Sequence, residues 1–260
     1  MKGFLQEYGI IMVVVAVVLG MLAFGKTGYA KSIQEAILGS ADHIVETGEN
    51  IVPKPLKAGT VIGIKTHKYS TIPSKYIVLE EKDMDKYLVL QYDDPWATQI
   101  TKDFSGIYEG STMDNSLENG VYNQFSDSLK LAIQITNIKQ SSYSNQHPTS
   151  KHETGPNGET YNTISRHVFA PSVDEIGNLV DLNNPDKVDK LLDDLGTYHF
   201  WTRDSYYNKR ESYRFMSVTK ENGGPLYPTY PNGGNSDRLW AFVIDLSKIN
   251  YTEVGHVDYK

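Results

Sequence analysis

The sequence predicts an α+β protein in which a long hydrophobic N-terminal helix precedes a globular head of small antiparallel sheets with flanking helices. Residues 8–25 carry no charge and are mostly aliphatic. A linker with two prolines follows at 51–58, and beyond it the apolar residues change from helical spacing to short alternating runs, which is typical of strands. We therefore divide the chain into residues 1–50, the linker 51–58 and a domain over 59–260.

Composition excludes several classes of function. The formal net charge is -7 and the lysines are scattered, so nucleic acid is not an expected partner. The chain has no cysteine, which excludes thiolate metal sites, thiol nucleophiles and disulfides. It has 18 tyrosines against 8 phenylalanines, and tyrosine covers a wet surface with a rigid amphipathic ring. This usage is typical of an exposed recognition surface or of a sheet with one solvated face.

The N-terminal segment is expected to form a helix that lies in a membrane or packs against copies of itself. Residues 8–25 at about 1.5 Å each reach roughly 27 Å, just enough to cross the hydrocarbon layer. Ala16, Gly20 and Ala23 recur along one stripe, where small residues let helix backbones approach closely. An amphipathic pattern continues beyond this run, and the helix is expected to end near Gly48.

Three interpretations of this segment remain open. It could be a secretory signal cleaved after Gly28–Ala30, or a membrane anchor. The third comes from a resemblance: Gly3–Tyr8, followed by an aliphatic run, is similar to the start of a type IV pilin. This resemblance implies a filament core of bundled N-terminal helices, with Phe4 as the first mature residue and Glu7 helping to register the subunits. Counted from Phe4, Glu7 falls fourth, where the family usually has it fifth, so processing stays open.

The first half of the domain is expected to contain three strands, at 60–65, 76–80 and 87–92, because short apolar runs alternate there with turn residues. Apolar residues at helical spacing then predict one or two short helices within 115–138. Residues 139–165 lose all periodicity and predict a long loop.

The second half is expected to contain two helices. Ser172–Glu175 has the spacing of a capping box, so one helix should start at Val173. A second is predicted over 186–195, with Gly196 just beyond its end. The remaining short apolar runs are predicted to be strands: 168–171, 200–203, 213–219 and 239–245.

Several short blocks recur in this order: Asn115–Leu117 leading to Tyr122 and Phe125, Val168–Phe169 with Ser172 and Glu175, Phe200–Arg203, and Asp237–Arg238 before a last apolar run. Their order resembles a widespread bacterial domain of unknown function whose fold is similar to that of C-type lectins and formylglycine-generating enzymes. The resemblance covers about residues 59–246. It implies a compact core with two helices and a loop-rich face that diversifies for binding. The oxidative chemistry of the related enzymes needs cysteine, which this chain lacks.

No catalytic residue, metal ligand or cofactor is assigned. The histidines lack zinc-ligand spacing, and the loop near residue 230 lacks the spacing of a calcium loop. Aromatic faces and guanidinium groups suit sugars and carboxylates, although such residues also tie strand ends to a core. The candidate ligand-contact residues are Trp201, Arg203, Tyr206, Tyr207, Tyr227, Tyr230, Asn232, Asn235 and Arg238.

The sequence therefore predicts a pilin-like, non-catalytic subunit of a bacterial cell-surface filament, inserted in the membrane before assembly and then displaying its head for adhesion or as a coat. It would polymerise with copies of itself through Phe4, Glu7, Ala16, Gly20 and Ala23. The alternative is a monomeric, membrane-anchored surface receptor or lectin-like protein with a glycan or protein ligand. An enzyme is the third class considered.

Overall fold

The structure is a computed structural model that describes residues 55–65, 73–93, 106–145, 147–211, 214–220, 225–229 and 239–260. The chain divides into two units, Met1–Lys54 and Pro55–Lys260, and every described residue belongs to the second.

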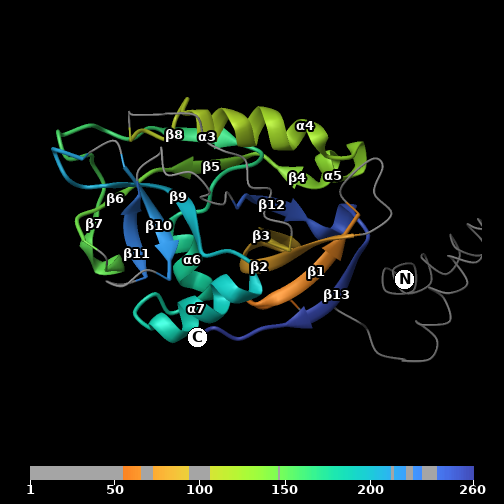
Figure 1. The fold of residues 1–260 in the computed structure, drawn as a ribbon. Coiled ribbons are helices and arrows are strands. Elements are labelled where there is room, and N and C mark those ends of the chain that lie inside the picture. Colours follow the sequence, from red (N-terminus) through yellow and green to blue (C-terminus); the bar gives the residue numbers. More distant parts are fainter. Residues whose placement is uncertain are drawn as a thin grey trace, which may run out of the picture. The chain divides into compact units, whose positions relative to one another are not determined.

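A six-stranded antiparallel sheet forms one part of the domain (Figure 1). Its order is β13 (Tyr251–His256), β1 (Thr60–Ile64), β2 (Ser74–Asp83), β3 (Lys86–Asp93), β12 (Ala241–Asp245) and β4 (Ile133–Gln134). β12 is buried along its whole length, and β2 is buried over its apolar middle, Tyr76–Leu79, whereas its charged end is exposed. β2 and β3 form a hairpin whose turn includes Asp85 at φ 59°, a conformation that aspartate tolerates.

A second, five-stranded sheet has the order β11 (Leu226–Thr229), β10 (Phe215–Thr219), β9 (His199–Tyr206), β6 (Ser142–Tyr143) and β7 (Lys151–His152). β6 pairs with β9 in parallel, and the other neighbours are antiparallel. A separate two-stranded ribbon joins β5 (Thr136–Lys139) to β8 (Thr163–Arg166).

Short helices flank the sheets on two sides (Figure 1). One row contains α3 (Thr112–Asn115), the π-helix η1 (Ser116–Val121), α4 (Tyr122–Gln124) and α5 (Asp127–Ala132). On the opposite side, α6 (Val173–Leu179) packs against β2, and α7 (Pro185–Asp194) packs against β10. The described residues also form two 3₁₀ turns, η2 (Pro148–Ser150) and η3 (Leu246–Lys248).

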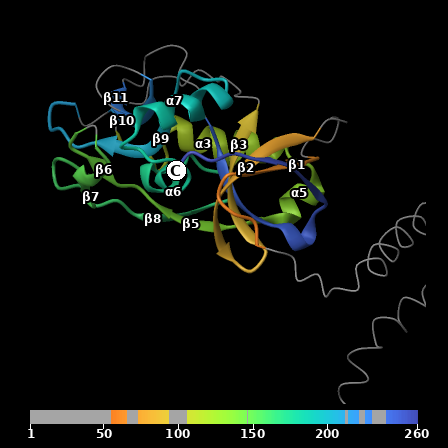
Figure 2. The same ribbon diagram turned by 90° about the horizontal axis from the view of Figure 1, so that it is seen from below.

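The C-terminus lies beside α6, as the view from below shows (Figure 2). Val180 pairs with Tyr259, whose hydroxyl donates to Asp194 Oδ2 at 2.8 Å. Tyr259 is 1% exposed and belongs to the core, whereas its neighbours Asp258 and Lys260 are exposed.

The predicted fold class is wrong in its main feature. The structure is mostly sheet, and its two principal sheets are larger than the small antiparallel sheets expected. No long apolar helix occurs among the described elements, the longest helix being α7 with 10 residues. None of the helices in the described ranges is both long and apolar enough to cross a lipid bilayer. Residues 1–50, to which the long helix was assigned, lie outside those ranges.

Two local predictions also need correction. The helical prediction over 115–138 holds only to Ala132, because Ile133–Lys139 form β4 and β5. The predicted loop 139–165 contains β6, η2, β7 and the start of β8. Its strands have two to four residues, too short to create a periodic pattern.

Candidate binding site

A buried ion pair joins β9 to α6. Arg203 donates to Glu175 from both terminal nitrogens, at 2.7 and 2.8 Å, and their side chains are 6% and 12% exposed. Arg203 also donates to the carbonyl oxygens of Lys139 and Ala170 at 3.0 Å each. Burial alone would raise the pKa of Glu175, but the guanidinium and the hydrogen bonds hold this pKa below its usual range.

Asp204, the next residue on β9, is also buried and connects three segments. Its Oδ1 accepts from the backbone N–H of Ser141 at 2.8 Å, and its Oδ2 accepts from that of Val173 at 2.7 Å. Burial raises the pKa of Asp204 to about 6, against the opposing effects of Arg203 and the two N–H groups. The carboxyl group therefore fixes the start of α6 against β9 and the segment that enters β6.

A second polar cluster holds the helical row against β8. Arg166 donates to both carboxylate oxygens of Asp114 at 2.6 Å, and the Asp114 side chain is fully buried. Glu118, on the π-helix, lies 2.7 Å from the ring Nδ1 of His167, which stacks on Tyr122 with centroids 4.3 Å apart. Since Asp114 and Glu118 each also accept backbone N–H groups, these contacts have a structural role.

We call one cavity, of about 130 Å³, the Arg203 pocket. Its wall comes from four segments that are distant in the sequence: the chain before α3, the end of β5 and the residue after it, the chain leading into β8, and β9. The residues that line it are Ile107, Tyr108, Glu109, Ile138, Gln140, Thr160, Tyr161, Asn162, Ile164 and Arg203.

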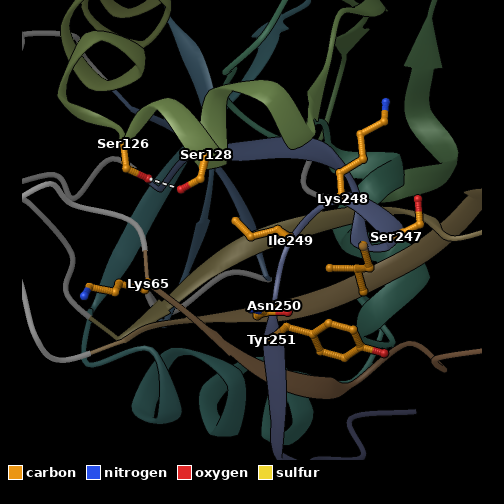
Figure 3. A pocket seen from close by; sticks show the side chains of 9 residues that line it. Lys65, Ser126, Ser128, Ser247, Lys248, Ile249, Asn250 and Tyr251 are labelled. Carbon is orange, nitrogen blue, oxygen red and sulfur yellow. Dashed lines mark hydrogen bonds between the residues drawn. The ribbon is translucent and has the colours of Figure 1, made fainter. Parts of the chain in front are cut away.

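A larger and more open depression of about 840 Å³, which we call the serine groove, lies where β1, α5, η3 and β13 meet (Figure 3). It is lined by Lys65, Ser126, Ser128, Leu246, Ser247, Lys248, Ile249, Asn250 and Tyr251. The hydroxyl oxygens of Ser126 and Ser128 lie 3.1 Å apart at one side, as Figure 3 shows. The lining has two ammonium groups, those of Lys65 and Lys248. The Lys248 ammonium forms an ion pair with Asp245 at 3.0 Å, which fixes its position.

The predicted ligand-contact residues differ in how far the structure exposes them. Trp201 and Arg203 are buried at 2% and 5% exposure, and Arg203 lines the Arg203 pocket. Tyr206, Tyr207 and Tyr227 are half-buried, and Tyr207 stacks on His152 with ring centroids 3.8 Å apart. The other predicted site residues lie outside the described residues: Phe4, Glu7, Ala16, Gly20, Ala23, Tyr230, Asn232, Asn235 and Arg238.

Sequence reasoning missed the other residues of both depressions. Tyr108, Gln140 and Tyr161 occur singly in irregular stretches, and only the folded chain brings them together. The serines and Asn250 of the groove carry no spacing pattern that distinguishes them from turn residues. No sequence signal could have identified them.

The fold and these depressions define a two-sheet domain whose hydrophobic core contains a buried ion pair and whose surface has polar hollows. Within the described ranges no group of three or more histidine, aspartate or glutamate side chains could hold a metal ion. The family model described as Domain of unknown function (DUF6273) matches residues 84–224, more than half of the 260 residues, and the chain belongs to this family. No curated protein and no solved structure matches the chain. The resemblances to pilins and to the C-type-lectin fold stay predictions.

Proposed function

We propose that this chain is a non-catalytic binding protein of the bacterial surface that holds a polar polymer, such as a glycan, in the serine groove. The observation that carries the proposal is the chemistry of the groove lining. In an acidic chain, this lining has hydroxyl, amide and ammonium groups and no carboxylate.

Such a lining suits a ligand rich in hydroxyl or acidic groups. Serine and tyrosine hydroxyls both donate and accept, and the Asn250 amide does the same through separate atoms. Lys65 adds positive charge that attracts acidic substituents, whereas the charge of Lys248 is compensated by Asp245. The groove is open to solvent, which fits a polymer that passes through it, and the Tyr251 ring lies at its side (Figure 3).

The proposed location rests on the sequence. The uncharged, mainly aliphatic run Ile10–Phe24 would attach the protein to the membrane, and the domain that begins near Pro55 would lie outside the cell.

The proposal is tested with the full-length chain and two soluble polysaccharides, neutral dextran and acidic alginate, in affinity electrophoresis. Lys65→Glu places a carboxylate in the groove, and Lys57→Glu makes the same change at an exposed site outside it. We expect alginate to retard the parent protein and Lys57→Glu, and to retard Lys65→Glu at least fivefold less. Equal retardation of both variants, or none of the parent by either polysaccharide, would overturn the proposal.

A filament subunit is the second candidate, and the small residues Ala16, Gly20 and Ala23 favour it. Electron microscopy of the native surface separates the two. Fibres that disappear in Gly20→Leu support polymerisation through the N-terminal segment. Evenly distributed single molecules support the tethered binding protein.

A further inference from the structure

We propose that the Arg203 pocket binds the acetamido group of an N-acetylated amino sugar. This site is separate from the serine groove and shares no lining residue with it. The inference extends the proposed function by naming one sugar class, and it depends on four properties of the pocket: its size, its buried donors, its apolar wall and the acceptors at its mouth.

The size of the pocket selects a small group. A volume of about 130 Å³ accommodates about four waters at roughly 30 Å³ each. An acetamido group, with its methyl, carbonyl and N–H, fills such a space, whereas a whole sugar ring does not. The ring would therefore stay at the mouth, where Thr160 and Asn162 are exposed.

The buried part of the wall has hydrogens to donate. Arg203 has five N–H groups and uses four of them on Glu175, Lys139 and Ala170, which leaves one on Nη2 with no acceptor among the described residues. The Tyr108 hydroxyl accepts from Ala170 N at 3.0 Å, and its own hydrogen has no described acceptor either. Burial raises the pKa of Tyr108 well above its usual range, so this hydroxyl keeps its proton. Two buried residues of the wall thus each keep a hydrogen to donate, and the acetamido oxygen of the proposed ligand lies at these donors.

The rest of the wall suits a methyl group. Ile107, Ile138 and Ile164 line the pocket, and Ile138 is 3% exposed. Apolar contact with a methyl favours an acetylated amine over the free amine, which would also place a charge against these side chains.

The charges around the pocket favour a neutral ligand over a carboxylate. The positive charge of Arg203 is already compensated by Glu175, and Glu109 adds a negative charge at the mouth. Asn162 Nδ2 donates to Glu109 Oε2 at 2.9 Å, which orients the second Glu109 oxygen and the Asn162 carbonyl as acceptors for the amide N–H or the ring hydroxyls.

The test uses the full-length chain and three sugars in NMR or calorimetric titration: N-acetylglucosamine, glucosamine and glucose. We expect N-acetylglucosamine to bind with a dissociation constant on the order of 1 mM, and the other two at least tenfold more weakly. Ile107→Trp fills the mouth of the pocket, and Ile135→Trp places the same ring on an exposed isoleucine outside it. N-acetylglucosamine binding should fall at least tenfold in the first variant and stay unchanged in the second.

Equal binding of all three sugars would show that the acetamido group is not recognised. No binding of N-acetylglucosamine at a concentration 20-fold above the expected dissociation constant would show that the pocket holds only water. Either result overturns the assignment. Tighter binding of N-acetyl-lysine methylamide than of N-acetylglucosamine would also overturn the sugar as occupant. Lys65→Glu serves as a cross-check, because loss of alginate binding with intact N-acetylglucosamine binding separates the serine groove from this pocket.

Discussion

Arg203 and Glu175 form a two-pronged ion pair that connects the middle of β9 to the first turn of α6. Glu175 also closes the capping box of this helix, because its Oε2 accepts from Ser172 N at 2.8 Å. One carboxylate thus satisfies a buried cation and a helix end together, and removing either partner leaves the other without compensation.

Glu175→Gln is expected to destabilise the domain strongly. Breaking a buried pair by neutralising one partner leaves an uncompensated charge and costs about 3–5 kcal/mol of unfolding free energy. Urea denaturation measures this loss. Glu153→Gln is the control, because this side chain is 61% exposed in its pairs with Lys139 and Lys151 and should cost at most about 1 kcal/mol. Similar losses in the two variants would show that the buried pair contributes no more than a surface pair.

Asp204 should make the domain more stable as the pH falls from 6 to 4. Its pKa is about 6 in the folded chain and about 3.9 when unfolded, so the folded state binds the extra proton in this window. The stabilisation that this proton adds is fully present below about pH 4 and is lost as the pH rises through 6. The unfolding free energy changes by up to roughly 3 kcal/mol across this range. Carboxyl groups with lowered pKa, such as Glu175, oppose this gain once the pH falls toward their unfolded pKa of about 4.3.

The comparison uses Asp204→Asn, which removes the titration. It also turns an amide N–H₂ toward a backbone N–H, so the variant should be less stable at every pH. Denaturation from pH 4.5 to 6.5 should show the difference between the two proteins shrinking toward high pH. A constant difference would show that Asp204 does not titrate in this range.

Ser172→Ala is expected to cost about 1 kcal/mol, because the Ser172 hydroxyl accepts from Glu175 N at 3.1 Å at the start of α6. Ser165→Ala is the matched control. Its exposed hydroxyl donates to the Asn137 side chain, and the change should fall within about 0.5 kcal/mol. Thermal unfolding distinguishes the two, and an equal effect would contradict the capping contribution.

Gly59→Ala should damage the fold more than Gly158→Ala. Both glycines have positive φ, 90° and 85°, so each substitution carries strain of about 1–2 kcal/mol. A Cβ at Gly59 would also overlap the carbonyl oxygen of Val257, whereas one at Gly158 meets nothing within 4 Å. We expect Gly158→Ala to unfold slightly earlier than the parent and Gly59→Ala to lose most of its stability. Equal midpoints in urea would refute the steric argument.

Local signals predicted the parts of the fold that depend on few neighbours. The capping box at Ser172 and the end of α7 before Gly196, which has φ 68°, are confirmed. The strands predicted at 60–65, 76–80 and 87–92 correspond to β1, β2 and β3. These elements succeed because turn and cap chemistry acts within a few residues.

Signals that depend on distant partners failed. Ile133 continues the helical spacing of Leu129, yet it is a strand residue because it pairs with Ile244 of β12. For the candidate site, the sequence singled out Arg203 but not Glu175 as its partner, 28 positions away. A pocket assembled from four separate segments leaves no periodic trace in the chain.

β1 lies between β2 and β13, so the first strand of the domain pairs with the last. During synthesis, β1 therefore cannot complete its pairing until residues 251–256 have been made. In a nascent chain that stops before Tyr251, the backbone N–H and C=O groups along one edge of β1 are unpaired. Such an edge can mispair with neighbouring polypeptides, so chaperones at the ribosome or the translocation channel would have to cover β1.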